Sequence, residues 1–130
     1  MAASIESVYS DKAPNPIGPY SQALRAGGLL WCSGQIPIDP STGKVTGETA
    51  AEQAAQVLEN LKAVLLAGGA SSERVVRTGI FLVDLDDFAA VNEVYARYFP
   101  GDAAPARSTV QVASLPRGVR VEIEAVALAD

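Results

Sequence analysis

The sequence predicts an α+β fold, a two-layer sandwich in which two helices cover one face of a mixed β-sheet. Three observations predict it: strand-like segments before residue 37, a long capped helical pattern from Thr49, and a second helical pattern after Asp84 that lies between further strand-like segments. In chain order the elements are β-β-β-α-β-α-β-β, in one domain over residues 1–130. Two helices cover only one face of such a sheet, so we expect a second subunit on the other.

The first three strands are expected at residues 4–9, 21–26 and 29–36. Residues 11–20 contain three prolines and must form a loop, because proline lacks the backbone donor that a strand or helix needs. The pair Gly27-Gly28 is typical of a tight hairpin turn between the second and third strands. A polar surface loop follows.

The first helix begins at a capping-box pattern, Thr49 with Glu52, and ends at Gly68-Gly69. Apolar residues recur at helical spacing and predict a buried stripe, made of Ala54, Val57, Leu58, Leu61, Val64 and Leu65.

Residues 74–83 are apolar on both sides of their alternation and predict a central strand. The acidic segment 84–87 then caps the second helix, which ends before Pro100 and Gly101. Its inward face is expected to consist of Phe88, Val91, Val94, Tyr95 and Tyr98.

The C-terminal residues 105–125 predict two alternating strands joined by a tight turn at 115–118. If the two strands pair as an antiparallel hairpin, Val110 faces the core, while Arg107 and Glu122 project together from the non-core face. That face is either ordinary solvated strand surface or half of a site.

Composition narrows the possible functions. The net charge is −5, whereas polyanion binding needs an excess of cations, so nucleic acid is a poor candidate partner. The chain has no histidine, which excludes Ser-His-Asp triads, Cys-His dyads and histidine-ligated zinc. Its acidic residues are not clustered at the spacing of a calcium or magnesium loop, so we expect no metal.

The same considerations predict a cytoplasmic protein. The single cysteine, Cys32, allows no intramolecular disulfide and suits a reducing compartment. The first residues lack the charged and apolar regions of a signal peptide, and no apolar run approaches the length of a membrane span.

Four motifs together resemble the RidA/YjgF family (reactive intermediate deaminase A). The signature is Pro-Ala-Arg-Ser at 105–108 followed by Val-Glu-Ile-Glu at 121–124. Ile-Gly-Pro-Tyr at 17–20, Ser-Gly-Gln-Ile-Pro at 33–37 and the pattern of residues 84–92 resemble the family's other landmarks. The resemblance extends over essentially the whole chain.

The resemblance implies a chorismate-mutase-like fold and a homotrimer with clefts between neighbouring subunits. It further implies hydrolysis of 2-imino acids (2-iminobutanoate, 2-iminopropanoate) to 2-oxo acids and ammonia, without a metal or organic cofactor. An imine carbon is already electrophilic, so such an enzyme needs mainly to hold the substrate carboxylate, place a water and move a proton.

Two matched residues would carry this chemistry. Arg107 would bind the substrate carboxylate, since a guanidinium is planar and always charged; the alternative is an ordinary salt bridge. Glu122 matches the family's glutamate that orients or activates water. Its alternatives are a solvated strand carboxylate, or Glu124 on the same face as the functional residue.

The other matched positions would line the substrate. Tyr20 would pack on it and donate a hydrogen bond, and Ser33 and Gly34 would offer a hydroxyl and a backbone N–H. Asn92 matches a family position near the cleft. Thr109 stands where several relatives have cysteine; its backbone N–H can still face the carboxylate. A half-buried loop aromatic, a strand-end bulge and a plain helix residue are the structural alternatives for Tyr20, Ser33-Gly34 and Asn92.

Two rival functions remain open on this reasoning. A regulatory module of the same fold could bind 2-oxo acids without turnover, and would need Arg107 and Tyr20 but not Glu122. A ribonuclease or translation inhibitor would need RNA binding, against which the acidic balance argues.

Overall fold

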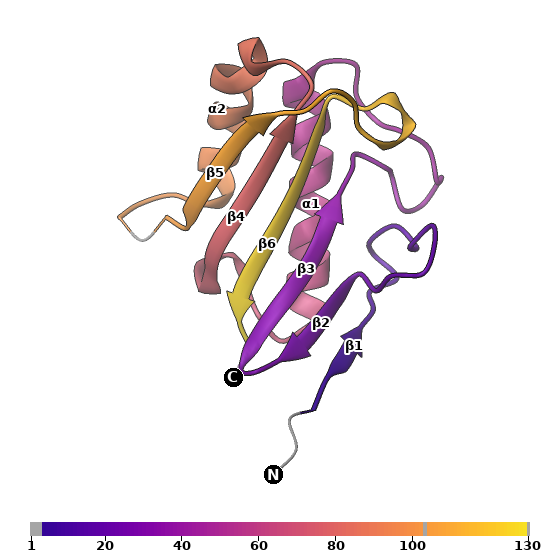
Figure 1. Ribbon diagram of the computed structural model, residues 1–130, viewed down its shortest axis with the longest axis vertical. Helices are drawn as coiled ribbons and strands as arrows, with labels where there is room; N and C mark the ends of the chain where they lie inside the picture. Colours follow the sequence, from indigo (N-terminus) through magenta and orange to yellow (C-terminus); the bar gives the residue numbers. More distant parts are fainter. Residues whose placement is uncertain (1–3, 103, 130) are drawn as a thin grey trace.

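In the computed structural model, which describes residues 4–102 and 104–129, two helices lie on one face of a six-stranded sheet (Figure 1). The elements are β1 (Glu6–Val8), β2 (Ala23–Ala26), β3 (Leu29–Gln35), α1 (Ala50–Ala67), β4 (Val75–Leu82), α2 (Phe88–Tyr98), β5 (Ala106–Gln111) and β6 (Val121–Leu128). Their order is the predicted one, and the predicted fold class is confirmed. Residues 1–3, on which part of the signal-peptide expectation rests, lie outside the described residues.

The strand order in the sheet is β1-β2-β3-β6-β4-β5; among the described residues, β4 and β5 pair in parallel, and all other neighbouring strands pair antiparallel. The predicted central position of β4 is confirmed, and so is the β2–β3 hairpin, where Gly27 and Gly28 adopt the left-handed φ values of 63° and 76° that such a tight turn requires.

The predicted C-terminal hairpin is wrong, because β4 lies between β5 and β6. The segment that joins β5 to β6 is longer than a two-residue turn and contains a short 3-10 helix at Pro116–Gly118. It therefore spans the roughly 10 Å across one intervening strand. The apolar β4 pairs with both neighbours and gains a ladder of hydrogen bonds on each side.

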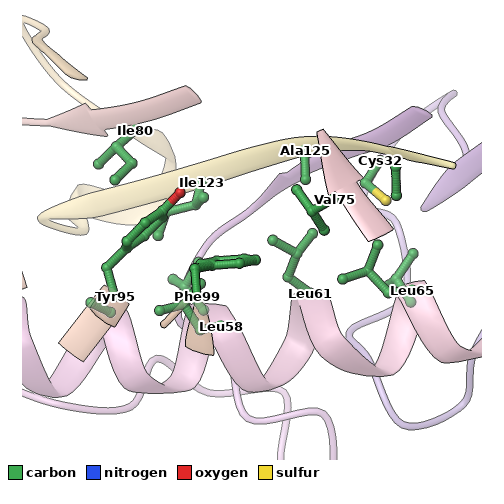
Figure 2. Close-up of a cluster of buried hydrophobic side chains, with 14 of the residues drawn as sticks. Cys32, Leu58, Leu61, Leu65, Val75, Ile80, Tyr95, Phe99, Ile123 and Ala125 are labelled. Carbon is green, nitrogen blue, oxygen red and sulfur yellow. The ribbon is translucent and has the colours of Figure 1, made fainter. Parts of the chain in front are cut away.

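The core lies between the sheet and α1, whose predicted stripe is buried in full. Figure 2 shows Leu58, Leu61 and Leu65 of α1 pointing toward Val75, Ile123 and other sheet residues. The capping box is confirmed: Thr49 Oγ1 accepts from the Glu52 N–H at 3.1 Å, and Glu52 Oε1 accepts from the Thr49 N–H at 3.0 Å.

The second helix buries less than its pattern predicted. Val91, Val94 and Tyr95 are buried, but Phe88 is 38% exposed and Tyr98 only half-buried. Asp84 caps a preceding 3-10 turn, Leu85–Asp87, rather than α2 itself. Phe88 is thus the first α-helical residue. The helix α2 lies over the β5 edge of the sheet (Figure 1), and no further strand among the described residues lies beside β5 to cover the Phe88 ring.

The face of the sheet without helices carries exposed apolar side chains. The strand register puts Leu24, Trp31, Val110 and Leu128 on this open face, and each is at least about a third exposed. Val110 was expected to face the core, so its position is a correction. Separately, no helix of the described residues has the length and apolar character needed to cross a bilayer.

Candidate functional site

A cleft of about 530 Å³ opens where β3 ends beside β6, and four of the predicted site residues line it: Tyr20, Ser33, Gly34 and Glu122. Its walls come from the proline-rich loop, the end of β3 and the turn that contains Arg117. Motifs at 17–20, 33–37 and 121–124 are therefore brought together by the fold, although about a hundred residues separate the first from the last.

The loop that carries Tyr20 is held by a buried amide. Gln22, 2% exposed, accepts from the Ser10 N–H at 2.6 Å and donates to the Ser10 and Pro14 carbonyls at 3.0 and 2.9 Å. These bonds satisfy loop carbonyls that have no strand partner. Tyr20 is 51% exposed. Within the part of the chain that the structure describes, its hydroxyl accepts only a long bond of 3.4 Å from the Ile17 N–H, so the hydroxyl hydrogen can be donated to a ligand.

Ser33 is tied to the neighbouring strand. Its hydroxyl donates to the Ser21 carbonyl at 2.6 Å, and its backbone N–H donates to the Gln22 carbonyl at 2.9 Å. Both donors of this residue are therefore occupied, and the hydroxyl oxygen remains free to accept. If Ser33 offers its hydroxyl to a ligand, as predicted, it can do so as an acceptor.

Gly34 lets Glu122 lie directly against β3. The β3–β6 register shifts between Cys32 and Gln35, and a Cβ at residue 34 would come within 2.9 Å of Glu122 Cδ and closer still to its Oε2. Only glycine permits this approach. The strand-end irregularity that was the structural alternative at Gly34 is present as this register shift, and it leaves room for the Glu122 carboxylate.

Glu122 sits in an environment that favours its neutral form. Burial, and secondly the charge of Glu124, raise the pKa of Glu122 above its ordinary value. Among the described residues, no cation or hydrogen-bond donor counteracts these two causes. A half-buried carboxylate with a raised pKa holds a proton more readily than an exposed one and can exchange it with water.

Arg107 does not line this cleft; it lies on the face of β5 that packs against the helices. Its partner in the register is the buried Thr78, and its Nη1 donates to Asn92 Oδ1 at 2.8 Å. The guanidinium carbon lies 4.9 Å from the ring centre of Tyr95 and 5.5 Å from that of Phe88. Two aromatic faces and an amide hold the cation.

Arg107 and Glu122 do not share a face within one chain, which corrects the expectation drawn from the hairpin. Arg107 pairs with Thr78 on the helix side, whereas Glu122 pairs with Phe81 on the open side. The strand β4 also stands between them. Side chains alternate along a strand, so the face on which a β5 residue lies depends on its pairing with β4. Arg107 and Glu122, which would share a face in a β5–β6 hairpin, therefore lie on opposite faces of this sheet.

Thr109 and Asn92 lie with Arg107 rather than in the cleft. Val112 N–H donates to the Leu82 carbonyl at 2.8 Å, so by alternation the Thr109 N–H points away from β4, toward the free edge of the sheet. The Thr109 hydroxyl oxygen is buried, with no hydrogen-bond partner among the described residues. Asn92 binds the arginine, so in this structure it positions Arg107.

Sequence reasoning missed Arg117, which lines the same cleft as Glu122. Its backbone is left-handed, with φ 58°, unlike every other described residue except glycines, and its Nη1 donates to the Gly43 carbonyl at 3.1 Å. A strained backbone at a non-glycine residue beside a cleft is a functional signal. The motif Leu-Pro-Arg-Gly predicted only a turn.

Cys32 is buried, and burial raises its pKa to about 12. The thiol therefore stays protonated and is a poor nucleophile, as expected for a core cysteine. Within residues 4–102 and 104–129, no three cysteine, aspartate or glutamate side chains gather as metal ligands would.

The chain is similar to known proteins over nearly its full length. The family model described as Endoribonuclease L-PSP matches residues 10–129. Protein DfrA of Myxococcus xanthus is 56% identical over 125 residues, 95% of each chain. The 2-iminobutanoate/2-iminopropanoate deaminase of Mus musculus is 47% identical over 129 residues, 98% of this chain and 95% of that protein.

Solved structures agree with the sequence comparisons. RidA from the Antarctic bacterium Psychrobacter sp. matches with a TM-score of 0.90 and 43% identity, covering 95% of this chain and 98% of that one. The resemblance drawn from the four motifs is confirmed, and the chain belongs to the Endoribonuclease L-PSP family, which includes the RidA proteins.

Proposed function

We propose that this protein hydrolyses 2-imino acids, such as 2-iminobutanoate and 2-iminopropanoate, to 2-oxo acids and ammonia. The observation that carries the proposal is the half-buried Glu122 carboxylate, with its raised pKa, seated on Gly34 in a cleft beside Tyr20. Support comes from the mouse relative, whose name states this deaminase activity.

The chemistry needs one water and one proton relay. Glu122 takes a proton from water as the water oxygen bonds to C2 of the imine, and the C=N π electrons move to nitrogen. Glu122 returns that proton to nitrogen, which gives the carbinolamine. It then takes the C2 hydroxyl proton and passes it to nitrogen as the C–N bond breaks, so that the hydroxyl becomes the oxo group and ammonia leaves. A carboxylate with a raised pKa can serve as base in the first step and acid in the second. The Tyr20 hydroxyl is free to donate to the substrate. No cofactor is required.

Arg107 is the proposed anchor of the substrate carboxylate, and we infer that it reaches the cleft of a neighbouring copy. Within one chain Arg107 and Glu122 lie on opposite faces of the sheet, which supports a site composed from two subunits. The apolar open face, with Trp31 and Val110, supports an assembly in which that face is covered. A homotrimer of one-domain chains is the proposed form.

The direct test couples the protein to a pyridoxal-phosphate threonine dehydratase, with semicarbazide present to trap free imine. We expect the wild type to accelerate 2-oxobutanoate formation against the trap, and Arg107→Ala to abolish the acceleration. A wild type that leaves the rate unchanged would refute imine hydrolysis for this substrate.

A mixing experiment tests the composite site. Arg107→Ala and Glu122→Gln are each expected to be inactive alone. In a cyclic trimer co-assembled from equal amounts of both, about a quarter of the sites would combine an intact Arg107 with an intact Glu122 from a neighbour. A site contained in one chain would give no recovery, and light scattering would report the number of subunits.

Binding of 2-oxo acids without turnover is the second candidate, because Arg107 is held by Asn92 and Tyr95 independently of Glu122. If Glu122→Gln retains the physiological function in a cell-based assay, the binding module is favoured. For either function, the single buried cysteine is compatible with the proposed cytoplasmic location.

A further inference from the structure

We propose that Thr78 and Tyr95 are positioning residues for Arg107: their buried hydroxyl–hydroxyl hydrogen bond fixes the aromatic ring on which the guanidinium rests. The inference rests on the proposed function, in which Arg107 binds the substrate carboxylate. It gives a functional role to a strand residue and a helix residue that the sequence pattern predicts only as core.

The contact is short and enclosed. Thr78 Oγ1 and Tyr95 Oη lie 2.7 Å apart, and the two residues are 0% and 6% exposed. The Tyr95 ring also packs on Phe99, with ring centres 4.6 Å apart. A ring fixed at its hydroxyl end and along its side has little freedom to turn.

Arg107 rests on this ring. Its guanidinium carbon lies 4.9 Å from the Tyr95 ring centre, closer than to Phe88, and Asn92 takes one of its N–H groups. A guanidinium has five N–H donors, so others remain for a carboxylate. A cation already held in place loses less rotamer freedom when a ligand binds, which improves affinity without a new contact.

Tyr95 acts here as a neutral ring. Burial, the largest cause, raises its pKa, although the Thr78 hydrogen bond and the charge of Arg107 both oppose the rise. A phenolate would form an ion pair with Arg107 and compete with the substrate carboxylate for it. The neutral phenol instead supports the cation through its π face.

Tyr98 provides a matched control, because its replacement shows what the loss of a tyrosine hydroxyl does when that hydroxyl has no part in positioning Arg107. Tyr98 lies on the same helix, and its hydroxyl donates to Glu59 at 2.5 Å, away from Arg107. Tyr98→Phe therefore removes the same atom, also with loss of one hydrogen bond. For the other partner, Thr78→Val removes the hydroxyl at nearly constant volume, while Thr78→Ser keeps it.

The experiment measures the Kd of 2-oxobutanoate by calorimetry, together with kcat, KM and Tm, for the wild type and these variants. Tyr95→Phe and Thr78→Val should each raise Kd and KM by about threefold to tenfold, the range for one neutral hydrogen bond, and change kcat by less than about twofold. The double variant should be no worse than either single one, because both remove the same bond. Thr78→Ser should restore wild-type values, and Tyr98→Phe should leave Kd and KM unchanged.

Several results would overturn the proposal. If Tyr95→Phe lowers Tm while leaving both Kd and KM unchanged, the pair of hydroxyls serves core packing only. Equal effects of Tyr98→Phe and Tyr95→Phe would show a general response to hydroxyl loss. Wild-type binding without turnover would refute the proposed hydrolysis, while the Kd comparison would still decide the role of Thr78 and Tyr95. If the wild type shows neither binding nor turnover, both the proposed hydrolysis and the positioning role of Thr78 and Tyr95 are refuted.

Discussion

Replacing Gly34 with alanine is the sharpest test of the position of Glu122. A Cβ at residue 34 would lie 2.9 Å from Glu122 Cδ and 3.0 Å from its Cγ, so the carboxylate must move. Gly34 is not among the glycines with positive φ, so alanine brings no backbone strain. The substitution therefore displaces one functional group and little else.

The expected effect falls on catalysis rather than on stability. A catalytic group displaced by about 1 Å can lose about 10²-fold in rate, and kcat/KM should fall by that order. Alanine restricts the unfolded chain and stabilises by about 0.4–1 kcal/mol. A strained Glu122 rotamer costs about 0.5–1.5 kcal/mol, so the net change in the free energy of unfolding should stay below about 1 kcal/mol.

The matched control is Gly79→Ala. A Cβ there would meet Glu124 Oε2 at 3.0 Å and Cγ at 3.1 Å, on the same face of the sheet, again without positive φ. The imine-trap assay, run over a pH series with Tm recorded in parallel, should show a large loss for Gly34→Ala and little for Gly79→Ala. Full activity of Gly34→Ala would refute the reasoning, and a loss confined to Gly79→Ala would transfer the role to Glu124.

Three further predictions concern single side chains. Glu122→Gln should lower kcat by about 10²-fold or more and raise Tm at neutral pH, because the folded chain otherwise carries a charge in a site that disfavours it. The folded state binds this proton more tightly than the unfolded state, so wild-type stability falls as pH rises from the unfolded to the folded pKa; Tm scans of Glu122→Gln should lack this contribution. Cys32→Ala should leave kcat/KM within about twofold, and native Cys32, whose pKa burial raises to about 12, should resist a thiol reagent until unfolding; rapid labelling would contradict this. Arg117→Gly should relieve the left-handed backbone and leave stability unchanged or higher by up to about 1 kcal/mol. An unchanged KM in that variant would show that Arg117 serves only the turn and does not contribute to substrate binding.

Elements with local signals were predicted well from the sequence. The capping box at Thr49, the stripe of α1 and the Gly27-Gly28 turn each depend on residues a few positions apart, and all are confirmed. The motifs also gave the members of the cleft, Tyr20, Ser33, Gly34 and Glu122, before the strands that assemble it were known.

Strand pairing was not predictable in the same way. Alternation in residues 106–111 shows which side chains share a face, but not which face meets the helices or which strand lies alongside. Both choices depend on competition between distant strands, and β4 pairs with β5 and β6 on its two sides. For that reason the expected partnership of Arg107 and Glu122 within one hairpin was wrong.

The sequence by itself therefore determined the fold class and the helices, and its motifs predicted the candidate site residues other than Arg117, because these follow from periodicity, caps and motifs. Only the tertiary structure decided that Glu122 lies in the cleft while Arg107 rests on Tyr95 beneath α2, on the other face of the sheet. The physical reason is that non-local packing decides which strands pair and which face of a strand is buried. Here the contacts of the Arg107 guanidinium with Phe88, Asn92 and Tyr95 of α2 are part of that packing.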